Sequence, residues 1–126
     1  PHAYPFDREE GETGTLGWRS LWEALLGDIR QGVEPAVIAA RFHLGVVQAV
    51  VESARMLCDE NGLDTAALGG GVFQNRLLLD GVSAALRESG LRVLSPEKVP
   101  ANDGGLALGQ AAIAAAQGVS PRAGAG

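Results

Sequence analysis

Three consecutive glycines, Gly69, Gly70 and Gly71, form the stretch of this sequence best suited to chemistry. A short apolar run precedes them and a leucine-rich helical pattern follows. A strand, a glycine turn and a helix can together present backbone N–H groups and a helix N-terminus to an anionic ligand. Three glycines in a row are costly in chain entropy, so either a ligand approaches the backbone closely or the turn requires unusual dihedral angles.

The glycine turn does not match the common nucleotide-binding patterns. No Gly-Lys-Ser/Thr follows it, so it is not a Walker A loop, and it is not G-x-G-x-x-G. A tight turn that packs the helix closely against the strand explains the glycines as well as a ligand does. The spacing alone therefore leaves both interpretations open.

Two polar side chains near helix starts have two possible roles each. Asn75 can cap the helix that follows the glycines, or it can point its amide at a ligand. Asp103 stands before an apolar helix, where a carboxylate can satisfy the first N–H groups and suits the helix dipole. The same carboxylate, on a Gly-Gly loop, can also bind a divalent metal. The sequence alone favours the cap for Asp103.

The remaining reactive residue types give no catalytic set. We expect His2 to be exposed, His43 to bond a nearby backbone carbonyl, and Cys58 to be a buried filler. No H-x-x-x-H or C-x-x-C pair is present, so a metal site would need ligands from elsewhere. No Ser-His-Asp or Cys-His arrangement is supported by the spacing either. The catalytic residues stay unknown at this point.

Composition limits the class of protein. The chain has 126 residues, 46 % of them hydrophobic, which suits one domain or one lobe of a larger domain. Its net charge of −5 does not favour nucleic-acid binding, and no apolar run reaches about 18 residues, so no membrane span is expected. A single cysteine is consistent with the cytoplasm. The first residue is Pro1 rather than methionine, so we expect a cut inside a longer protein.

Hydrophobic periodicity predicts an α/β order of elements. The expected elements are two short strands within 1–17, a helix from 18 to about 31, a short helix 35–41 separated at Gly45 from a long one 44–60, a strand 65–68, a helix 74–89, a strand 92–95, and a last helix from about 106 to 117. The last helix is apolar nearly all round, which is typical of a helix buried on several sides. Two convincing strands are few for a complete sheet, so an incomplete lobe is favoured.

Two motifs resemble one known family. Gly-Gly-Gly-Val-Phe-Gln-Asn-Arg-Leu-Leu-Leu (69–79) and Val-Pro-Ala-Asn-Asp-Gly-Gly-Leu-Ala-Leu-Gly-Gln-Ala (99–111) closely resemble the C-terminal end of the HypF carbamoyltransferases of [NiFe]-hydrogenase maturation. The stretch Ile-Ala-Ala-Arg-Phe-His (38–43) is also similar. The resemblance implies one lobe, the second half, of an actin/Hsp70/sugar-kinase-like ATPase domain of the TsaD-like type. That lobe would cover residues 1–117, with 118–126 as a flexible tail.

The resemblance also implies an activity and a site. Members of this family use carbamoyl phosphate and ATP to form carbamoyl-adenylate, and they pass the carbamoyl group to the C-terminal cysteine of a HypE-type acceptor protein. Gly69, Gly70, Gly71 and Asn75 would then bind the nucleotide, although the family more often has serine at position 69. Asp103 would be one ligand of a divalent metal ion (zinc, iron or magnesium) whose other ligands lie upstream. His43 would remain structural.

The partners expected from this resemblance are the upstream domains of the same protein and the HypE-type acceptor, with no nucleic acid and no membrane. The chain alone should be inactive, and an apolar face left without its other half would favour self-association. Two alternatives stay open: a lobe of the related transferase that makes threonylcarbamoyladenosine in tRNA, and a non-catalytic actin-like scaffold lobe.

Overall fold

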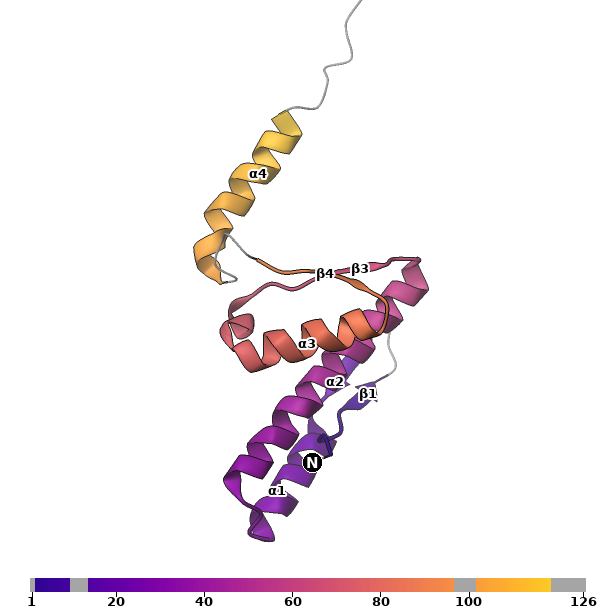
Figure 1. The fold of residues 1–126 in the computed structure, drawn as a ribbon, viewed down its shortest axis with the longest axis vertical. Coiled ribbons are helices and arrows are strands. Elements are labelled where there is room, and N and C mark those ends of the chain that lie inside the picture. Colours follow the sequence, from indigo (N-terminus) through magenta and orange to yellow (C-terminus); the bar gives the residue numbers. More distant parts are fainter. Residues whose placement is uncertain (1, 10–13, 97–101, 119–126) are drawn as a thin grey trace, which may run out of the picture.

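The computed structural model describes every residue except 1, 10–13, 97–101 and 119–126 (Figure 1). Its elements in chain order are β1 (Asp7–Glu9), β2 (Thr15–Gly17), α1 (Arg19–Arg30), α2 (Pro35–Asn61), β3 (Thr65–Ala67), the 3₁₀ helix η1 (Gly71–Gln74), α3 (Arg76–Glu88), β4 (Arg92–Leu94), the 3₁₀ helix η2 (Asp103–Gly105) and α4 (Leu106–Gly118). The predicted α/β order of helices and strands is confirmed.

A β–α–β unit forms the centre of the fold. Strands β3 and β4 pair in parallel, with Ala66 opposite Val93, and α3 connects them. Helices α2 and α3 pack against each other, and each also contacts one strand of the pair. Four buried residues form the core cluster: Val51, Leu68, Val82 and Leu86. Burying an aliphatic side chain of this size contributes about 1.5–3 kcal/mol relative to leaving it exposed, so this cluster holds the strand pair on its helices.

The two long helices of this unit end at Asn61 and Glu88, each within one residue of the ends at 60 and 89 that the sequence predicts, and a glycine with positive φ follows each helix. Gly62, with φ +64°, ends α2, and Gly90, with φ +85°, follows α3. Beyond Gly90 the N–H of Leu91 donates to the carbonyl of Leu86 at 3.1 Å, while Gly90 donates to Arg87 at 2.9 Å. These two hydrogen bonds define a Schellman ending, which turns the chain back into β4.

The N-terminal segment is fastened to both α1 and α2. The two short strands expected within 1–17 are confirmed: β1 begins at Asp7 and pairs antiparallel with β2. The hydroxyl of Tyr4 and the Nη1 of Arg41 both donate to Oδ2 of Asp28, the latter at 2.6 Å. The Tyr4 hydrogen bond, followed by the Arg41 hydrogen bond, lowers the pKa of the Asp28 carboxyl. Three segments are therefore joined through one carboxylate.

The predicted break at Gly45 is wrong, because α2 runs without interruption from Pro35 to Asn61. Gly45 is buried, and a Cβ placed on it would lie 2.6 Å from the carbonyl oxygen of Tyr4. The glycine is therefore required for the close approach of the N-terminal segment and not for a bend in the helix.

Helix α2 is also the longest apolar element. It has 27 residues, and an 18-residue window of it reaches a mean hydropathy of 1.3. By length and composition alone it could cross a membrane, although a core helix of a folded domain passes the same test. Here α2 packs against α1, α3 and β3.

Helix α4 departs from the expectation of burial on several sides. It extends away from the rest of the fold (Figure 1), and it contains no buried residue. Leu106, Leu108 and Ile113 are 60 %, 58 % and 60 % exposed. Within the described part of the chain, no element supplies the surface that so apolar a helix requires. The predicted tail falls mostly on residues 119–126, which lie outside the described residues.

Candidate functional site

The glycine turn and the segment before α4 leave the sheet at the same edge. Parallel strands end on the same side, and the N–H of Leu68 still donates to the carbonyl of Leu94 at 2.8 Å just before the glycines begin. From this edge one chain segment turns into η1 and the other leads toward α4 (Figure 1). Ligands of open α/β sheets bind outside the carboxyl ends of the strands. The topology thus places both predicted motifs at one end of the sheet.

Gly70 is required by its backbone conformation. Its φ of +103° and ψ of 158° lie in a region that essentially only glycine occupies. Gly69 and Gly71 have no such φ. Among the described residues, a Cβ built on any of the three glycines meets no atom within 4 Å apart from its own chain neighbours. The glycines therefore do not serve close packing of the helix on the strand, and the open space above the turn favours the interpretation that a ligand approaches the backbone.

A 3₁₀ turn separates the glycines from the helix. Phe73 donates its N–H to the carbonyl of Gly70, and Asn75 donates to Val72, both at 3.1 Å. Phe73 packs against the core cluster and anchors this turn. As a result α3 begins at Arg76 rather than at Gln74, where the sequence placed it.

Asn75 is the N-cap of α3. Its Oδ1 accepts hydrogen bonds from the N–H groups of Leu77 at 3.1 Å and Leu78 at 3.3 Å. An asparagine cap of this kind contributes about 1 kcal/mol. The cap occupies the carbonyl half of the amide, while Nδ2 faces Nε2 of His43 at 3.2 Å. The cap predicted for Asn75 is confirmed, and the amide nitrogen remains able to donate one further hydrogen bond.

His43 bonds a backbone carbonyl, as the sequence predicts. Its Nδ1 lies 2.8 Å from the carbonyl oxygen of Ala39, one turn earlier in α2. The contact with Asn75 joins residues 32 positions apart. No sequence signal indicated that contact, because the side of α2 that faces the glycine turn depends on how α2 and α3 pack.

Asp103 does not cap the last helix. The cap in this segment is Asn102, which caps the 3₁₀ helix η2 directly before α4: its Oδ1 accepts from the N–H of Gly104 at 2.9 Å. Asp103 is exposed, and its carboxylate forms no hydrogen bond or ion pair with the described residues. The sequence assigned the cap to the wrong member of the Asn-Asp pair. In the described part of the chain no three His, Cys, Asp or Glu residues group into a metal site.

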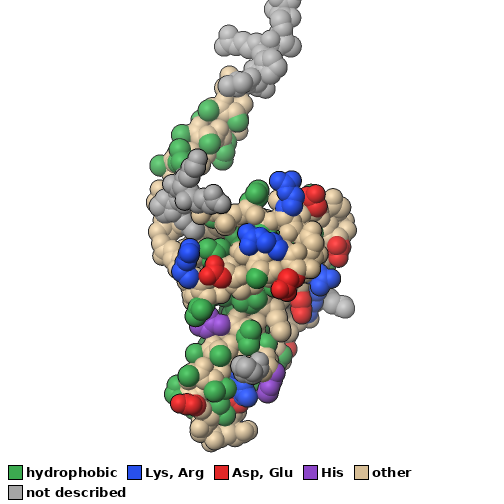
Figure 2. Space-filling model, viewed as in Figure 1, with side chains coloured by type: hydrophobic (Ala, Val, Ile, Leu, Met, Phe, Trp, Pro, Cys, Tyr) green, Lys and Arg blue, Asp and Glu red, His purple; other side chains and the backbone are tan. Residues whose placement is uncertain are grey.

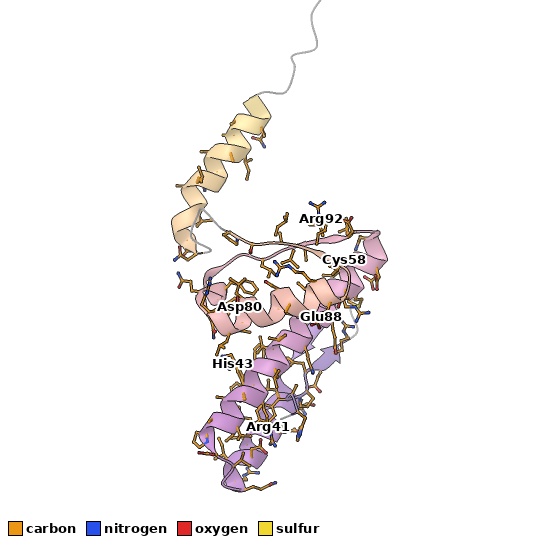
Figure 3. All side chains as sticks on the ribbon, viewed as in Figure 1. Arg41, His43, Cys58, Asp80, Glu88 and Arg92 are labelled. Carbon is orange, nitrogen blue, oxygen red and sulfur yellow. The ribbon has the colours of Figure 1, made fainter. Side chains whose placement is uncertain are left out.

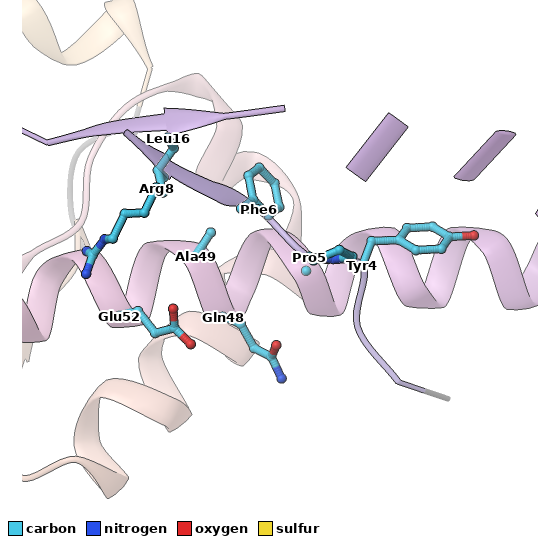
Figure 4. Close-up of a pocket in the computed structure, with 9 residues that line it drawn as sticks. Tyr4, Pro5, Phe6, Arg8, Leu16, Gln48, Ala49 and Glu52 are labelled. Atoms are coloured by element: carbon cyan, nitrogen blue, oxygen red, sulfur yellow. The ribbon is translucent and has the colours of Figure 1, made fainter. Parts of the chain in front are cut away.

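Among the hollows that the described residues form outside the glycine turn, two are considered for the site. One, of about 270 Å³, lies between the N-terminal segment and α2 and is lined by Tyr4, Phe6 and Glu52 among others (Figure 4). The other, of about 490 Å³, runs along α3 beside the end of β4, and its lining begins at Arg76, directly after the cap. Figure 2 shows charged side chains gathered over α3 on this face, whereas α4 carries none. Only the second hollow adjoins the candidate site.

Comparison with known proteins places the chain in a larger assembly of domains. Residues 1–110 match the family described as carbamoyltransferase, Kae1-like domain, second subdomain. A carbamoyltransferase HypF homolog from Cupriavidus necator is 44 % identical over 108 residues, which are 84 % of this chain and 27 % of that protein. A tRNA N6-adenosine threonylcarbamoyltransferase from Desulfitobacterium hafniense is 27 % identical over 119 residues, which are 88 % of this chain and 35 % of that protein.

Solved structures agree with the sequence relatives. A crystal structure of full-length HypF in the phosphate- and nucleotide-bound form superposes with a TM-score of 0.89 at 33 % identity, covering 98 % of this chain and 16 % of that one. The chain thus spans between about a sixth and a third of these relatives' lengths. The predicted α/β lobe, forming the second half of a larger domain, is confirmed by the fold match and by the family's description as a second subdomain.

Proposed function

Because the chain belongs to the HypF carbamoyltransferase family, we propose that it forms one wall of the cleft in which a carbamoyl group is transferred through carbamoyl-adenylate. The other wall, and the catalytic residues, would come from the upstream domains of the same protein. We take residues 1–117 as the lobe and 118–126 as its tail.

The observation that carries this proposal is the open glycine turn. Three glycines whose Cβ positions meet no neighbour lie at the carboxyl edge of parallel strands, beside an asparagine-capped helix start. This arrangement lets an adenine nucleotide approach the backbone at Gly69, Gly70 and Gly71, with the amide of Asn75 as a donor. The solved HypF relative holds phosphate and nucleotide, which supports ATP as the ligand here.

The chemistry proposed for the complete protein has two steps. In the first, hydrolysis of carbamoyl phosphate releases phosphate and leaves carbamate, whose oxygen bonds to the α-phosphorus of ATP while pyrophosphate leaves, which yields carbamoyl-adenylate. A cysteine thiolate of a HypE-type acceptor then attacks the carbamoyl carbon, so that a C–S bond forms, the C–O bond to the phosphate breaks and AMP leaves. Asp103 would supply one carboxylate to a divalent metal whose other ligands lie upstream, and such an ion stabilises developing negative charge when bound. Residues of this chain bind and orient the nucleotide.

The related tRNA-modifying transferase is the second candidate function. Its representative aligns over most of the chain, but at lower identity than the HypF homolog. The net charge of −5 gives no basic surface for tRNA, and Phe73-Gln74-Asn75 matches the HypF pattern. A scaffold lobe without chemistry is less well supported, because it would not need a glycine turn that is open among the described residues at the carboxyl edge of the strands. The lone, buried Cys58 fits a reducing compartment such as the cytoplasm.

The proposal is tested by ATP binding and carbamoyl transfer in the complete protein. We expect calorimetric ATP binding and transfer to a cysteine-terminated HypE-type acceptor when the upstream domains are present. The isolated 126-residue chain should bind ATP weakly or not at all, because it provides half of the cleft. Tight ATP binding by the isolated chain would contradict the shared cleft, and absence of carbamoyl transfer by the complete protein would contradict the proposed activity.

Apolar faces left open on this chain point to the surfaces that the upstream domains would cover. One is α4. Another is a stripe of half-exposed side chains at helical spacing along α1, which starts at the N-cap residue of that helix: Trp18, Trp22, Leu26 and Ile29. We expect the isolated chain to self-associate as its concentration rises, and the complete protein not to do so through these faces. Analytical ultracentrifugation of both measures this difference.

A polar double variant, Trp22→Gln with Leu26→Gln, serves as the control for the stripe. It should shift the isolated chain toward the monomer. In the complete protein it should leave ATP binding intact only if the upstream domains do not cover the stripe. An isolated wild-type chain that stays monomeric over the whole concentration range would show that these faces do not drive association.

A further inference from the structure

A continuous chain of hydrogen bonds runs from helix α2 to the first turn of α3. It begins at the carbonyl of Ala39, passes through both ring nitrogens of His43 and through the side-chain amide of Asn75, and ends at the N–H groups of Leu77 and Leu78. Figure 3 shows His43 on α2 beneath the N-terminal end of α3. Two helices far apart in sequence are thus connected through one imidazole and one amide.

The backbone groups at the two ends of this series of hydrogen bonds determine which atom donates in each bond. Leu77 and Leu78 present N–H groups, so the amide atom facing them must be the oxygen, and the nitrogen of Asn75 must face His43. An amide nitrogen only donates, so Nε2 of His43 accepts, and its proton therefore sits on Nδ1, which donates to Ala39. One consistent direction of donation results.

The helix cap does not require the hydrogen bond between Asn75 and His43. The cap uses Oδ1 of Asn75 alone, whereas the bond to His43 holds Nδ2 and so fixes the rotation of the amide plane. One N–H of the amide is committed to His43, and the second stays available beside the glycine turn, which is open to solvent. When a donor already has the orientation it needs in the complex, less conformational entropy is lost as the ligand binds.

We propose that His43 is a positioning residue for the nucleotide site: as an acceptor it orients the amide of Asn75 so that the free N–H points toward a nucleotide at the glycine turn. The inference rests on the proposed function, which places the nucleotide there. It extends that function by giving a role to a histidine on a different helix, which itself need not touch the ligand.

Equilibrium ATP binding and thermal unfolding of the complete protein test this role. His43→Ala should weaken ATP binding about 3- to 10-fold, the range expected for one lost hydrogen bond. His43→Gln, whose Oε1 can accept from Asn75, should stay within about twofold of wild type, because a neutral acceptor is restored. Gln48→Ala, an exposed site on the same helix, is the matched control and should bind ATP as the wild type does. If His43→Ala does not fold, His43→Leu against His43→Gln makes the same comparison at similar side-chain volume.

The double variant His43→Ala/Asn75→Ala separates positioning from a general structural effect. If His43 acts through Asn75, adding His43→Ala to Asn75→Ala should cost no further ATP affinity. Two independent losses that multiply, or His43→Gln as weak as His43→Ala, would overturn the positioning role. If Asn75→Ala itself binds ATP as tightly as wild type, the nucleotide role of Asn75 in the proposed function is wrong and the positioning role falls with it. If Asn75→Ala loses affinity and His43→Ala does not, only the positioning role is wrong.

Discussion

Gly70→Ala is expected to strain the glycine turn and to remove most ATP binding from the complete protein. Gly70 has φ +103°, and a non-glycine residue held in such a region costs about 1–3 kcal/mol. If the turn instead relaxes in the free protein, ATP binding must restore the strained backbone conformation. The same free energy is then subtracted from the binding free energy. That range corresponds to about 5- to 150-fold in the dissociation constant for ATP.

Gly71→Ala is the matched control for this prediction. Its backbone has no positive φ, and its Cβ would meet no atom within 4 Å, so we expect the thermal midpoint of the complete protein to stay at the wild-type value. A methyl group at Gly71 would still enter the space where the nucleotide approaches, so ATP affinity should fall without loss of stability. An equal thermal midpoint together with unchanged ATP affinity for Gly70→Ala would contradict the strain, because its cost must appear in one of the two quantities. Unchanged ATP affinity in both variants would contradict the placement of the nucleotide at this turn.

Local signals predicted the elements that local chemistry determines. The Asn75 cap, the glycine endings of α2 and α3, and the strand before the glycines each depend on a few neighbouring residues, and the structure contains them. The structure shows that β3 and β4 pair in parallel, so the strands that precede the two motifs end at the same edge of the sheet. The order of elements in the sequence only suggested this pairing.

Features that depend on distant contacts were not predictable in the same way. Gly45 reads as a helix break in sequence, but it serves the approach of Tyr4 from 41 positions away. Asn102 and Asp103 are equally good caps by composition, and only the local geometry shows that Asn102 accepts from Gly104. The bond between His43 and Asn75 depends on the packing of α2 on α3, which hydrophobic periodicity does not specify.

The family resemblance supplied two expectations that neither spacing nor the described geometry of this chain contains: an adenine nucleotide, and a divalent metal ion that could be zinc, iron or magnesium. Spacing favoured Asp103 as a cap, whereas the resemblance made it a ligand. The structure removes the cap alternative by assigning that role to Asn102, and it leaves the Asp103 carboxylate exposed and without a hydrogen bond among the described residues. The metal role of Asp103 therefore stays a prediction from the resemblance, and the carboxylate makes no contact among the described residues that competes with it.

Asp103→Asn should consequently lower the metal content of the complete protein while leaving its fold intact. Loss of a hydrogen-bonding neighbour of a metal ligand typically costs 10- to 100-fold in affinity, and loss of a ligand should cost at least about 100-fold. Because the Asp103 side chain supports no described hydrogen bond, stability should change by less than about 0.5 kcal/mol. Metal analysis after dialysis, thermal unfolding and carbamoyl transfer measure the three quantities.

Asp80→Asn is the matched control for Asp103→Asn, because Asp80 is another exposed aspartate, on α3 and outside the glycine turn. It should retain metal and carbamoyl transfer at wild-type values, so that a change in net charge alone is accounted for. Wild-type metal content in Asp103→Asn would remove Asp103 from the ligand set. Lost transfer with retained metal would instead assign the carboxylate to the nucleotide or acceptor.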